Sequence, residues 1–530
     1  MKRYGMVVDL NRCMGCQTCT IACKQANDTP PGVQWRRVLD VEQGSFPNVQ
    51  RLFLVTGCQH CAEPPCVPVC PTGATRQRED GLVTMNYDLC IGCGSCAVAC
   101  PYQARTIVHD AAGYYGEPTQ QERFTAHEDR IGVATKCTFC VDRIDAAAAR
   151  GLVPGVDAEV TPACAASCIA QAIRFGDFAD PASEVSRVAR ENANFQMHAG
   201  LGTDPRIRYL YEVPACTPGR DPEPADQDDE ALSDPANPLA GERQSWWDYR
   251  AAMNFILGGM ASGLLIVASL AALSGALKQA MLASATTAAG VIMALGLFFV
   301  FLKLGRKLHF PNVLLRPQTS WMTRETLCVA VFYPAAAANL LWPHPAAAAI
   351  AALAATGFLY CQAKMIHTSA GVPAWRAPLV PWLLVSTGLS EGLGLLVVLA
   401  AAFPAAGTDR ASLATAGIVL AAIHLALWRN YVSGAKAAGI GLGSRRDLGR
   451  VSPLLHLLAH ALPIACYGAG LATGSGAILL VGALGSVAGG ALWKAVLLRR
   501  ACHLQGFALP KLPQRGSGTR AAPPRLALSR

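Results

Sequence analysis

The chain has 530 residues, too many for one ordinary domain, and 52% of them are hydrophobic. Its net charge of +9 is modest, and we expect no nucleic-acid partner. Sixteen of the 21 cysteines precede residue 170. Disulfides in such numbers suit small secreted domains, and the opening MKRYGMVVDL shows neither a secretory nor a twin-arginine signal. The composition therefore favours another use for the cysteines.

Residues 1–215 read as a soluble α+β domain. Short strand-like runs at Tyr4–Asp9, Arg51–Thr56 and Gly81–Asn86 each come shortly before a group of cysteines. The groups themselves lie in turns rich in Gly and Pro, where small residues let the backbone approach a bound group closely.

The most distinctive group is DLCIGCGSCAVACPYQART, with the spacing C-x2-C-x2-C-x3-C and a proline after the last cysteine. This run is typical of bacterial ferredoxins, in which three thiolates hold one [4Fe–4S] cube and the fourth reaches a neighbouring cube. Three further groups resemble it, and the last of them is split by a long insertion. In chain order, the four groups are Cys13, Cys16, Cys19, Cys23; Cys58, Cys61, Cys66, Cys70; Cys90, Cys93, Cys96, Cys100; and Cys137, Cys140, Cys164, Cys168.

Sixteen thiolates are enough for four [4Fe–4S] cubes. Zinc also binds four thiolates, but its sites usually pair two C-x2-C turns and do not repeat a ferredoxin spacing. Because the fourth cysteine normally crosses to the partner cube, the second and third groups pair, and so do the first and fourth. The predicted ligand sets are Cys58, Cys61, Cys66, Cys100; Cys90, Cys93, Cys96, Cys70; Cys13, Cys16, Cys19, Cys168; and Cys137, Cys140, Cys164, Cys23.

Residues 216–245 are acidic and rich in proline, with little to bury, and we predict a solvated linker there. Residues 246–505 turn apolar in long blocks, most of which reach the ~20 residues that a membrane-spanning helix needs. Residues 506–530 are predicted to form a basic disordered tail. The eight candidate spans are 253–275, 280–302, 326–342, 344–366, 378–403, 411–432, 454–472 and 477–498.

Two sets of phrases carry a resemblance to a known family. GCQHCAEPPCVPVCPTGA, CIGCGSCAVACPYQAR and KCTFCVDR resemble the four-cluster iron–sulfur subunit of the dimethyl sulfoxide reductase family of molybdopterin oxidoreductases. KLGRKLHFPNVLLRPQTSWMTRE and AKMIHTSAGVPAW resemble the membrane-anchor subunit of the same family. The departure from the family is that these two subunits, normally separate, are fused. Some relatives carry tryptophan at the position of Cys93 and hold a three-iron cluster, so the cysteine here implies four cubes.

The expected fold is therefore an α+β double ferredoxin-like domain with four clusters, followed by an all-α transmembrane bundle of about eight helices. With the N-terminus inside, twelve basic residues fall in cytoplasmic loops, against Lys278 and Arg410 in the opposite loops. The positive-inside rule then predicts a cytoplasmic cluster domain and cytoplasmic termini in the inner membrane. We also count Lys494, Arg499, Arg500 and Lys511 on the inner side, after the last span.

Ionisable residues within spans are functional candidates, because they are costly in hydrocarbon. Glu391, flanked by glycines, could exchange a proton with a quinone, and His367 and Lys364 could hydrogen-bond its oxygens. A structural hydrogen bond for Glu391 and snorkelling for Lys364 remain open. His424, His456 and His460 leave a haem open as well.

The resemblance implies an electron-transfer protein that is not itself catalytic. It would relay electrons between a separate catalytic subunit, which carries molybdopterin, and a membrane quinone or quinol. The direction stays open between reduction of an S- or N-oxide and oxidation of sulfite, with a slight preference for sulfite. The alternative is a stand-alone membrane redox sensor or transporter that uses its clusters structurally, without a molybdenum partner.

Overall fold

The computed structural model describes residues 2–45, 48–110, 113–125, 127–211, 237–404 and 408–507. The chain divides into two units by its internal contacts. Unit 1 comprises Met1–Glu242 together with Leu504–Arg530, and unit 2 comprises Arg243–His503. Most of the predicted linker and nearly all of the predicted tail lie outside the described residues.

Unit 1 is built on a four-stranded sheet in the order β8-β1-β10-β9. Strand β1 (Tyr4–Asp9) is entirely buried and pairs antiparallel with β8 (Ile173–Asp177) and parallel with β10 (Ile207–Leu210). The short β9 (Asn194–Phe195) closes the sheet beside β10. The start of the chain is thus paired with segments that follow all four cysteine groups.

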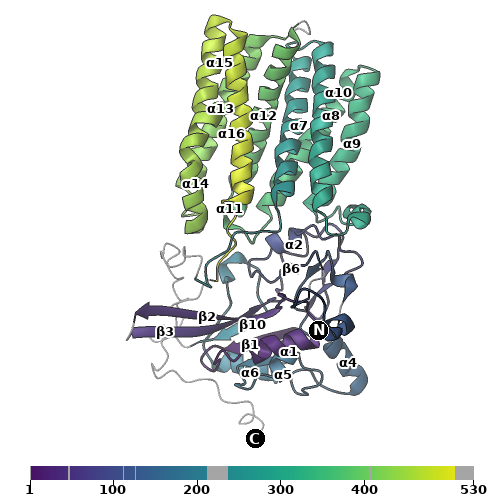
Figure 1. Cartoon of the computed structure of the whole chain (residues 1–530), viewed down its shortest axis with the longest axis vertical. Helices are drawn as coiled ribbons and strands as arrows, with labels where there is room; N and C mark the ends of the chain where they lie inside the picture. Colours follow the sequence, from purple (N-terminus) through teal and green to yellow (C-terminus); the bar gives the residue numbers. More distant parts are fainter. Residues whose placement is uncertain are drawn as a thin grey trace. The chain divides into compact units, whose positions relative to one another are not determined.

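Three two-stranded sheets complete the named β-structure of the described part of unit 1. The long β2 (Arg36–Ser45) and β3 (Asn48–Gly57) form the two-stranded ribbon in Figure 1. Shorter pairs join β4 (Thr75–Gln77) to β5 (Val83–Met85) and β6 (Thr106–Ile107) to β7 (Ala134–Thr135). The strands predicted at 4–9, 51–56 and 81–86 are confirmed: the first is β1, the second lies within β3, and the third contains the shorter β5.

The helices of unit 1 are short, and four of them begin at cysteine groups. In chain order, the helices are α1 (Thr18–Ala26), α2 (Ser95–Val98), α3 (Gln120–Thr125), α4 (Val141–Arg150), α5 (Ala163–Ala166) and α6 (Glu184–Glu191), with single turns η1 (Glu128–Arg130) and η2 (Ala199–Leu201).

The chain returns to unit 1 after unit 2. The Phe507 amide donates to the Leu239 carbonyl (2.9 Å), and the Leu504 amide donates to the Glu242 carbonyl (2.8 Å). Leu239 and Phe507 both belong to the core of unit 1. The last residues of the predicted linker and the first residues of the predicted tail are therefore packed side by side.

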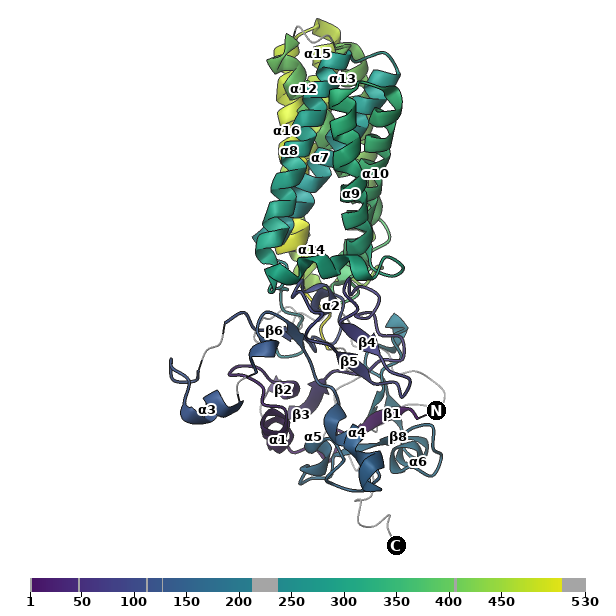
Figure 2. The same ribbon diagram turned by 90° about the vertical axis from the view of Figure 1, so that its right-hand side faces the viewer.

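Unit 2 is all-helical, and its long helices run alongside one another (Figure 1, Figure 2). The long helices are α7 (Tyr249–Leu273), α8 (Gln279–Lys303), α9 (Trp321–Leu341), α10 (Pro345–His367), α12 (Val380–Ala402), α13 (Arg410–Ser433), the continuous run α14 (Leu442–Leu455), η6 (His456–Ala461) and α15 (Leu462–Thr473), and α16 (Gly476–Arg499). Connections include η4 (Lys307–Leu315) and the short α11 (Pro373–Arg376).

Within the described residues, seven helices are long and apolar enough to cross a membrane, which makes the chain a multi-pass membrane protein. All eight predicted spans are helical, but α9 is not among the seven. Arg324 and Glu325 in its first turns and Asn339 near its end leave it less apolar. The predicted fold class, an α+β region followed by long apolar helices, is confirmed.

The run α14–η6–α15 contains one π-helical turn at His456–Ala461. Pro463 follows it directly and has no N–H to donate to the preceding turn. Such π-turns are rare and often mark functional positions.

Small residues allow α7 and α12 to approach closely. A Cβ on Gly263 would lie 1.8 Å from the Gly388 carbonyl oxygen, and one on Gly392 would lie 2.0 Å from the Gly263 carbonyl carbon. Association through small residues is common between helices in membranes, because it maximises van der Waals contact. These glycines fix the distance between the two helices.

We expect Gly392→Val to force α7 and α12 apart and to lower the stability of the detergent-purified protein by about 1–3 kcal/mol, seen as a lower melting temperature. Gly290→Val on α8 is the matched control, because a Cβ there meets no atom within 4 Å. Equal melting temperatures for the two variants would contradict the close α7–α12 contact.

Candidate functional site

The cysteine groups of unit 1 sit where the backbone turns sharply into a helix. The residues that precede α1, α2 and α4 are Gln17, Gly94 and Cys140, with φ values of 60°, 78° and 54°. This left-handed conformation is uncommon for residues other than glycine and marks positions held by their surroundings. The sharp turns let cysteines on either side of them face one shared space.

One cavity in unit 1 joins the first group to the end of the fourth. It lies between α1, the hairpin strands and the start of β8, and its remaining lining is mostly apolar. The cysteines that line it are Cys13, Cys16, Cys19 and Cys168. The fourth cysteine of the split group therefore lies with three cysteines of the first group, as the predicted ligand set requires.

A second cavity joins the second group to the end of the third. Its walls include His60, Tyr102 and Arg105 together with three prolines. The cysteines that line it are Cys58, Cys61, Cys66 and Cys100. This set also matches a predicted crossed set.

Electrostatic interactions between thiols indicate which cysteines lie together in the other two sets, those that contain Cys96 and Cys23. Burial raises the pKa of Cys96, and repulsion from the nearby thiolates of Cys70, Cys90 and Cys93 acts in the same direction. Burial likewise raises the pKa of Cys23, which lies close to other buried thiols. Those neighbours are Cys137, Cys164 and Cys140.

Backbone amides point at several of the sulfurs. The Ala172 amide donates to Cys168 Sγ (3.2 Å), the Phe139 amide to Cys137 Sγ (3.4 Å) and the Ala163 amide to Cys140 Sγ (3.5 Å). Hydrogen bonds to ligand sulfurs stabilise negative charge and influence the potential of an iron–sulfur cluster. The buried thiol sets, their cavities and these donors fit iron–sulfur cubes. Across the described ranges, no three His, Cys, Asp or Glu side chains converge on a point that would bind a single metal ion.

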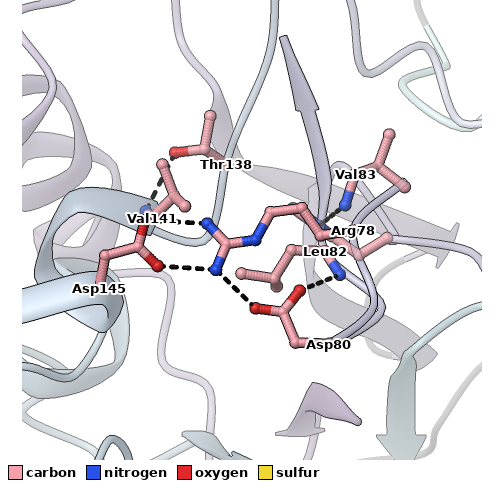
Figure 3. Close-up of polar contacts among 8 residues, drawn as sticks. Arg78, Asp80, Leu82, Val83, Thr138, Val141 and Asp145 are labelled. Atoms are coloured by element: carbon pink, nitrogen blue, oxygen red, sulfur yellow. Dashed lines mark hydrogen bonds and ion pairs between the residues drawn. The ribbon is translucent and has the colours of Figure 1, made fainter. Parts of the chain in front are cut away.

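A bidentate ion pair connects the β4–β5 turn to α4 (Figure 3). The Arg78 guanidinium donates to both carboxylate oxygens of Asp145 (2.8 and 2.7 Å) and also to Asp80 (2.8 Å). Bidentate pairs of this kind fix orientation as well as distance. Arg78 thereby fixes the hairpin between the second and third cysteine groups to the helix that follows Cys140.

The geometry of unit 1 defines an iron–sulfur electron-transfer protein, and comparison with known proteins agrees. Residues 49–113 match the family model "4Fe-4S dicluster domain". Relatives extend the similarity over more than 220 residues. The chain is 38% identical to a putative dimethyl sulfoxide reductase iron–sulfur subunit from Halobacterium salinarum, over 42% of this chain and 82% of the relative.

Two further relatives have comparable similarity. A selenate reductase subunit from Mesobacillus selenatarsenatis is 39% identical over 39% of this chain and 72% of the relative. A sulfite dehydrogenase subunit from Allochromatium vinosum is 39% identical over 40% of this chain and 83% of the relative. The chain belongs to the family of iron–sulfur subunits of dimethyl sulfoxide reductase-family enzymes, and a multi-helix apolar region follows that part.

In unit 2, Glu391 lies in the interior and is fully buried. Its partner is Lys494 on α16, whose ammonium group donates to Glu391 Oε2, while Glu391 Oε1 has no hydrogen-bond partner among the described residues. Counting Lys494 among the charges beyond the last span was therefore wrong. Its ammonium turns inward because the buried carboxylate on α12 stabilises it there.

The other two predicted quinone residues do not lie with Glu391. Lys364 and His367 belong to the last turn of α10, and Lys364 Nζ lies 5.7 Å from the centre of the Trp321 ring. Glu391 lies eleven residues into α12, roughly 17 Å from its start at a rise of 1.5 Å per residue. The structure thus separates the three predicted residues: Lys364 and His367 lie at the end of α10, whereas Glu391 is buried in the middle of α12.

Two of the three histidines considered for haem contact each other directly. His460 Nε2 lies 3.0 Å from His424 Nδ1, and His424 Nε2 lies 3.0 Å from Thr387 Oγ1. His456 stacks obliquely near His460, with ring centres 5.4 Å apart. Because the His424 and His460 rings share a hydrogen bond, they do not bracket a haem iron.

A second buried polar cluster was missed from the sequence. Glu325 on α9 is buried and hydrogen-bonds Gln362 on α10 and Asn254 on α7. The Gln362 amide donates to the Asn254 backbone carbonyl (3.1 Å), while Glu325 Oε1 and Asn254 Oδ1 have no partner in the part of the chain that the structure describes. The available signal was a carboxylate directly before an apolar run, but beside Arg324 it looked like part of a loop.

Proposed function

We propose that the chain is the electron-transfer and membrane-anchor subunit of a molybdopterin oxidoreductase. A separate catalytic subunit would carry the molybdopterin, as the names of the related iron–sulfur subunits imply. The observation that supports this most strongly is the crossed gathering of the sixteen cysteines, in which each fourth cysteine joins three from another group. Four such sets in a chain with membrane-spanning helices suit electron transfer to or from the membrane.

In this proposal each set holds one [4Fe–4S] cube, and such cubes, when bound, supply one-electron transfer. The chain's own residues orient the sulfurs, exclude water and fix the order of the sets. Three electrostatic interactions support that order: Cys19 interacts with Cys164, Cys137 interacts with Cys58, and Arg105 interacts with both Cys66 and Cys96. The sets then follow one another as Cys13 set, Cys137 set, Cys58 set and Cys90 set.

The crossed sets can be tested by matching spectra. We expect Cys100→Ser to abolish the same electron paramagnetic resonance signal as Cys61→Ser, because both residues line one cavity. Cys70→Ser should instead abolish the signal that Cys93→Ser abolishes. The measurement is a spectrum of each purified variant, reduced with dithionite, beside its iron content. Loss of the Cys93-dependent signal in Cys100→Ser would rule out the crossing.

We further propose that a quinone headgroup binds at the cluster of Glu325, Gln362 and Asn254. All three residues lie within five residues of a helix end, so the cluster is roughly 8 Å deep. The unpaired oxygens of Glu325 and Asn254 offer acceptors to a quinol, and the sequence candidates Lys364 and His367 lie at the same end of α10. Glu391, the third sequence candidate, is the alternative headgroup site.

We expect Glu325→Gln to slow quinone-linked turnover roughly tenfold or more, the effect of losing one charged hydrogen bond at a buried site. Reduction of the clusters by dithionite should be unchanged. Glu391→Gln is the matched comparison, since it neutralises the other buried carboxylate of unit 2. If Glu391→Gln slows quinone turnover while Glu325→Gln does not, the headgroup site belongs to the Glu391–Lys494 pair.

The charge pattern of the loops supports a cytoplasmic location for unit 1 and both termini. Removing Lys494 from the inner count leaves the twelve loop residues and their excess over Lys278 and Arg410 unchanged. A cytoplasmic head favours oxidation of sulfite with delivery of electrons to quinone. A dimethyl sulfoxide reductase would run in the opposite direction, from quinol to the S-oxide.

Mixing the oxidised, detergent-purified complex with sulfite tests the direction. We expect cluster signals to appear in the electron paramagnetic resonance spectrum, since electrons would enter from a sulfite-oxidising partner. If sulfite produces no cluster signal and dimethyl sulfoxide reoxidises reduced clusters, the direction of electron flow is the opposite one. A purified chain with no large molybdoprotein attached would instead favour a stand-alone redox sensor.

A further inference from the structure

Two arginines are buried in unit 1 without any acidic partner among the described residues. Arg36, at the start of β2, has no exposed surface, and Arg105 is 3% exposed. Arg36 donates to the Thr56 carbonyl (3.4 Å) and to Met6 Sδ (3.1 Å), and Arg105 donates to Thr75 Oγ1 and Met85 Sδ (both 3.1 Å). Within the described part of the chain, Arg36 Nε and Arg105 Nη2 have no partner. Burying a charged guanidinium without a carboxylate partner costs free energy unless some other negative charge lies nearby.

For Arg105, that charge comes from cysteines of two neighbouring sets. Its guanidinium lines the cavity of the Cys58 set. The thiols of Cys66 and Cys96 lie near enough to interact electrostatically with this guanidinium. Cys96 belongs to the Cys90 set, so Arg105 lies between two sets.

Arg36 occupies the equivalent position between the other two sets. It hydrogen-bonds the Cys164 thiol and also acts on Cys137 and Cys23, all members of the Cys137 set. It further acts on Cys19, a member of the Cys13 set. Each half of the double ferredoxin-like unit therefore has one buried arginine between its two cysteine sets.

A third basic side chain lies at the junction of the halves. Lys136 is fully buried and donates to the carbonyl oxygens of Val83 and Cys137, the latter at 2.8 Å. His60 lies beside it as a neutral donor, because its Nδ1 accepts from the Val83 amide (3.0 Å) and its Nε2 then donates to the Cys137 carbonyl (3.1 Å). Basic side chains thus alternate with the four sets along the row.

We propose that Arg36 and Arg105 are fixed counter-charges that raise the reduction potentials of the cubes on either side of them and weaken the repulsion between electrons on neighbouring cubes. This inference rests on the proposed function, in which each set holds a cube. Reduction adds one negative charge to a cube, so a cation held in a medium of low dielectric stabilises the reduced form. The row can then carry electrons on adjacent cubes at the same time.

The test is a potentiometric titration of the purified, cluster-loaded chain, followed by electron paramagnetic resonance. Arg105→Met removes the charge and keeps much of the length, whereas Arg105→Lys keeps the charge. We expect Arg105→Met to lower the midpoint potentials of the Cys58 and Cys90 sets by at least ~59 mV, a tenfold change in a one-electron equilibrium. Arg105→Lys should stay near the unmodified protein.

Arg36→Met is the matched variant in the other half, and it should lower only the potentials of the Cys13 and Cys137 sets. The signals are assigned by their loss in Cys61→Ser and Cys93→Ser. Three results would overturn the counter-charge role. The midpoint potentials of all four sets could shift equally, or Arg105→Met could leave them unchanged. Alternatively, Arg105→Lys could lower them as much as Arg105→Met does. If Arg105→Met loses iron, the titration is carried out on Arg105→Gln, with the same expected result.

The same titration separates this inference from the proposed function. A chain of unaltered sequence that binds fewer than four cubes by iron content would refute the proposed function itself. Four intact cubes whose potentials do not respond to either arginine would refute only the counter-charge role.

Discussion

The structure of unit 1 is organised around one constraint: the fourth cysteine of each group lies with three cysteines of another group. The sheet satisfies this constraint for Cys13 and Cys168. Strand β1 ends just before Cys13, β8 begins just after Cys168, and the pair Val8↔Ile173 brings these two ends together. The Asp9 amide continues the pairing by donating to the Ala172 carbonyl (2.7 Å). Pairing of these strands therefore brings Cys13 and Cys168 together.

Both units bury charge, but they balance it differently. In unit 2, Glu391 and Lys494 neutralise each other, because a bundle of apolar helices offers no other counter-charge and an isolated ion would be costly. In unit 1, Arg36 and Arg105 face thiolates instead of carboxylates. A buried ion pair is complete in itself, whereas a buried cation beside thiolates depends on those thiolates remaining ionised. The stability of unit 1 is thus tied to what the cysteines bind.

Spacing alone was enough to predict much of this protein. The four cysteine groups follow from the spacing of neighbouring cysteines. The strand at Tyr4–Asp9 and the long apolar blocks likewise follow from residues that are close together in the chain. The missed features depend on contacts between distant segments. Glu325 is buried only because α7 and α10 cover it, and Lys494 turns inward only because Glu391 lies opposite. Strand β2 escaped prediction because its apolar residues Val38, Leu39 and Val41 are interspersed with charged ones, and it is its pairing with β3 that makes it a strand.

The pairing of Leu239 with Phe507 makes unit 2 an insertion within unit 1. The returning segment also touches the cluster region, since the Gln103 side chain donates to the Gln505 carbonyl (3.1 Å) only three residues after Cys100. Translation proceeds from the N-terminus, so the ribosome must finish all the membrane helices before unit 1 can acquire its last segment. The pairing of Leu504 and Phe507 with the rest of unit 1 can therefore form only after the helices of unit 2 have been synthesised. Two independently made proteins would have no such built-in order.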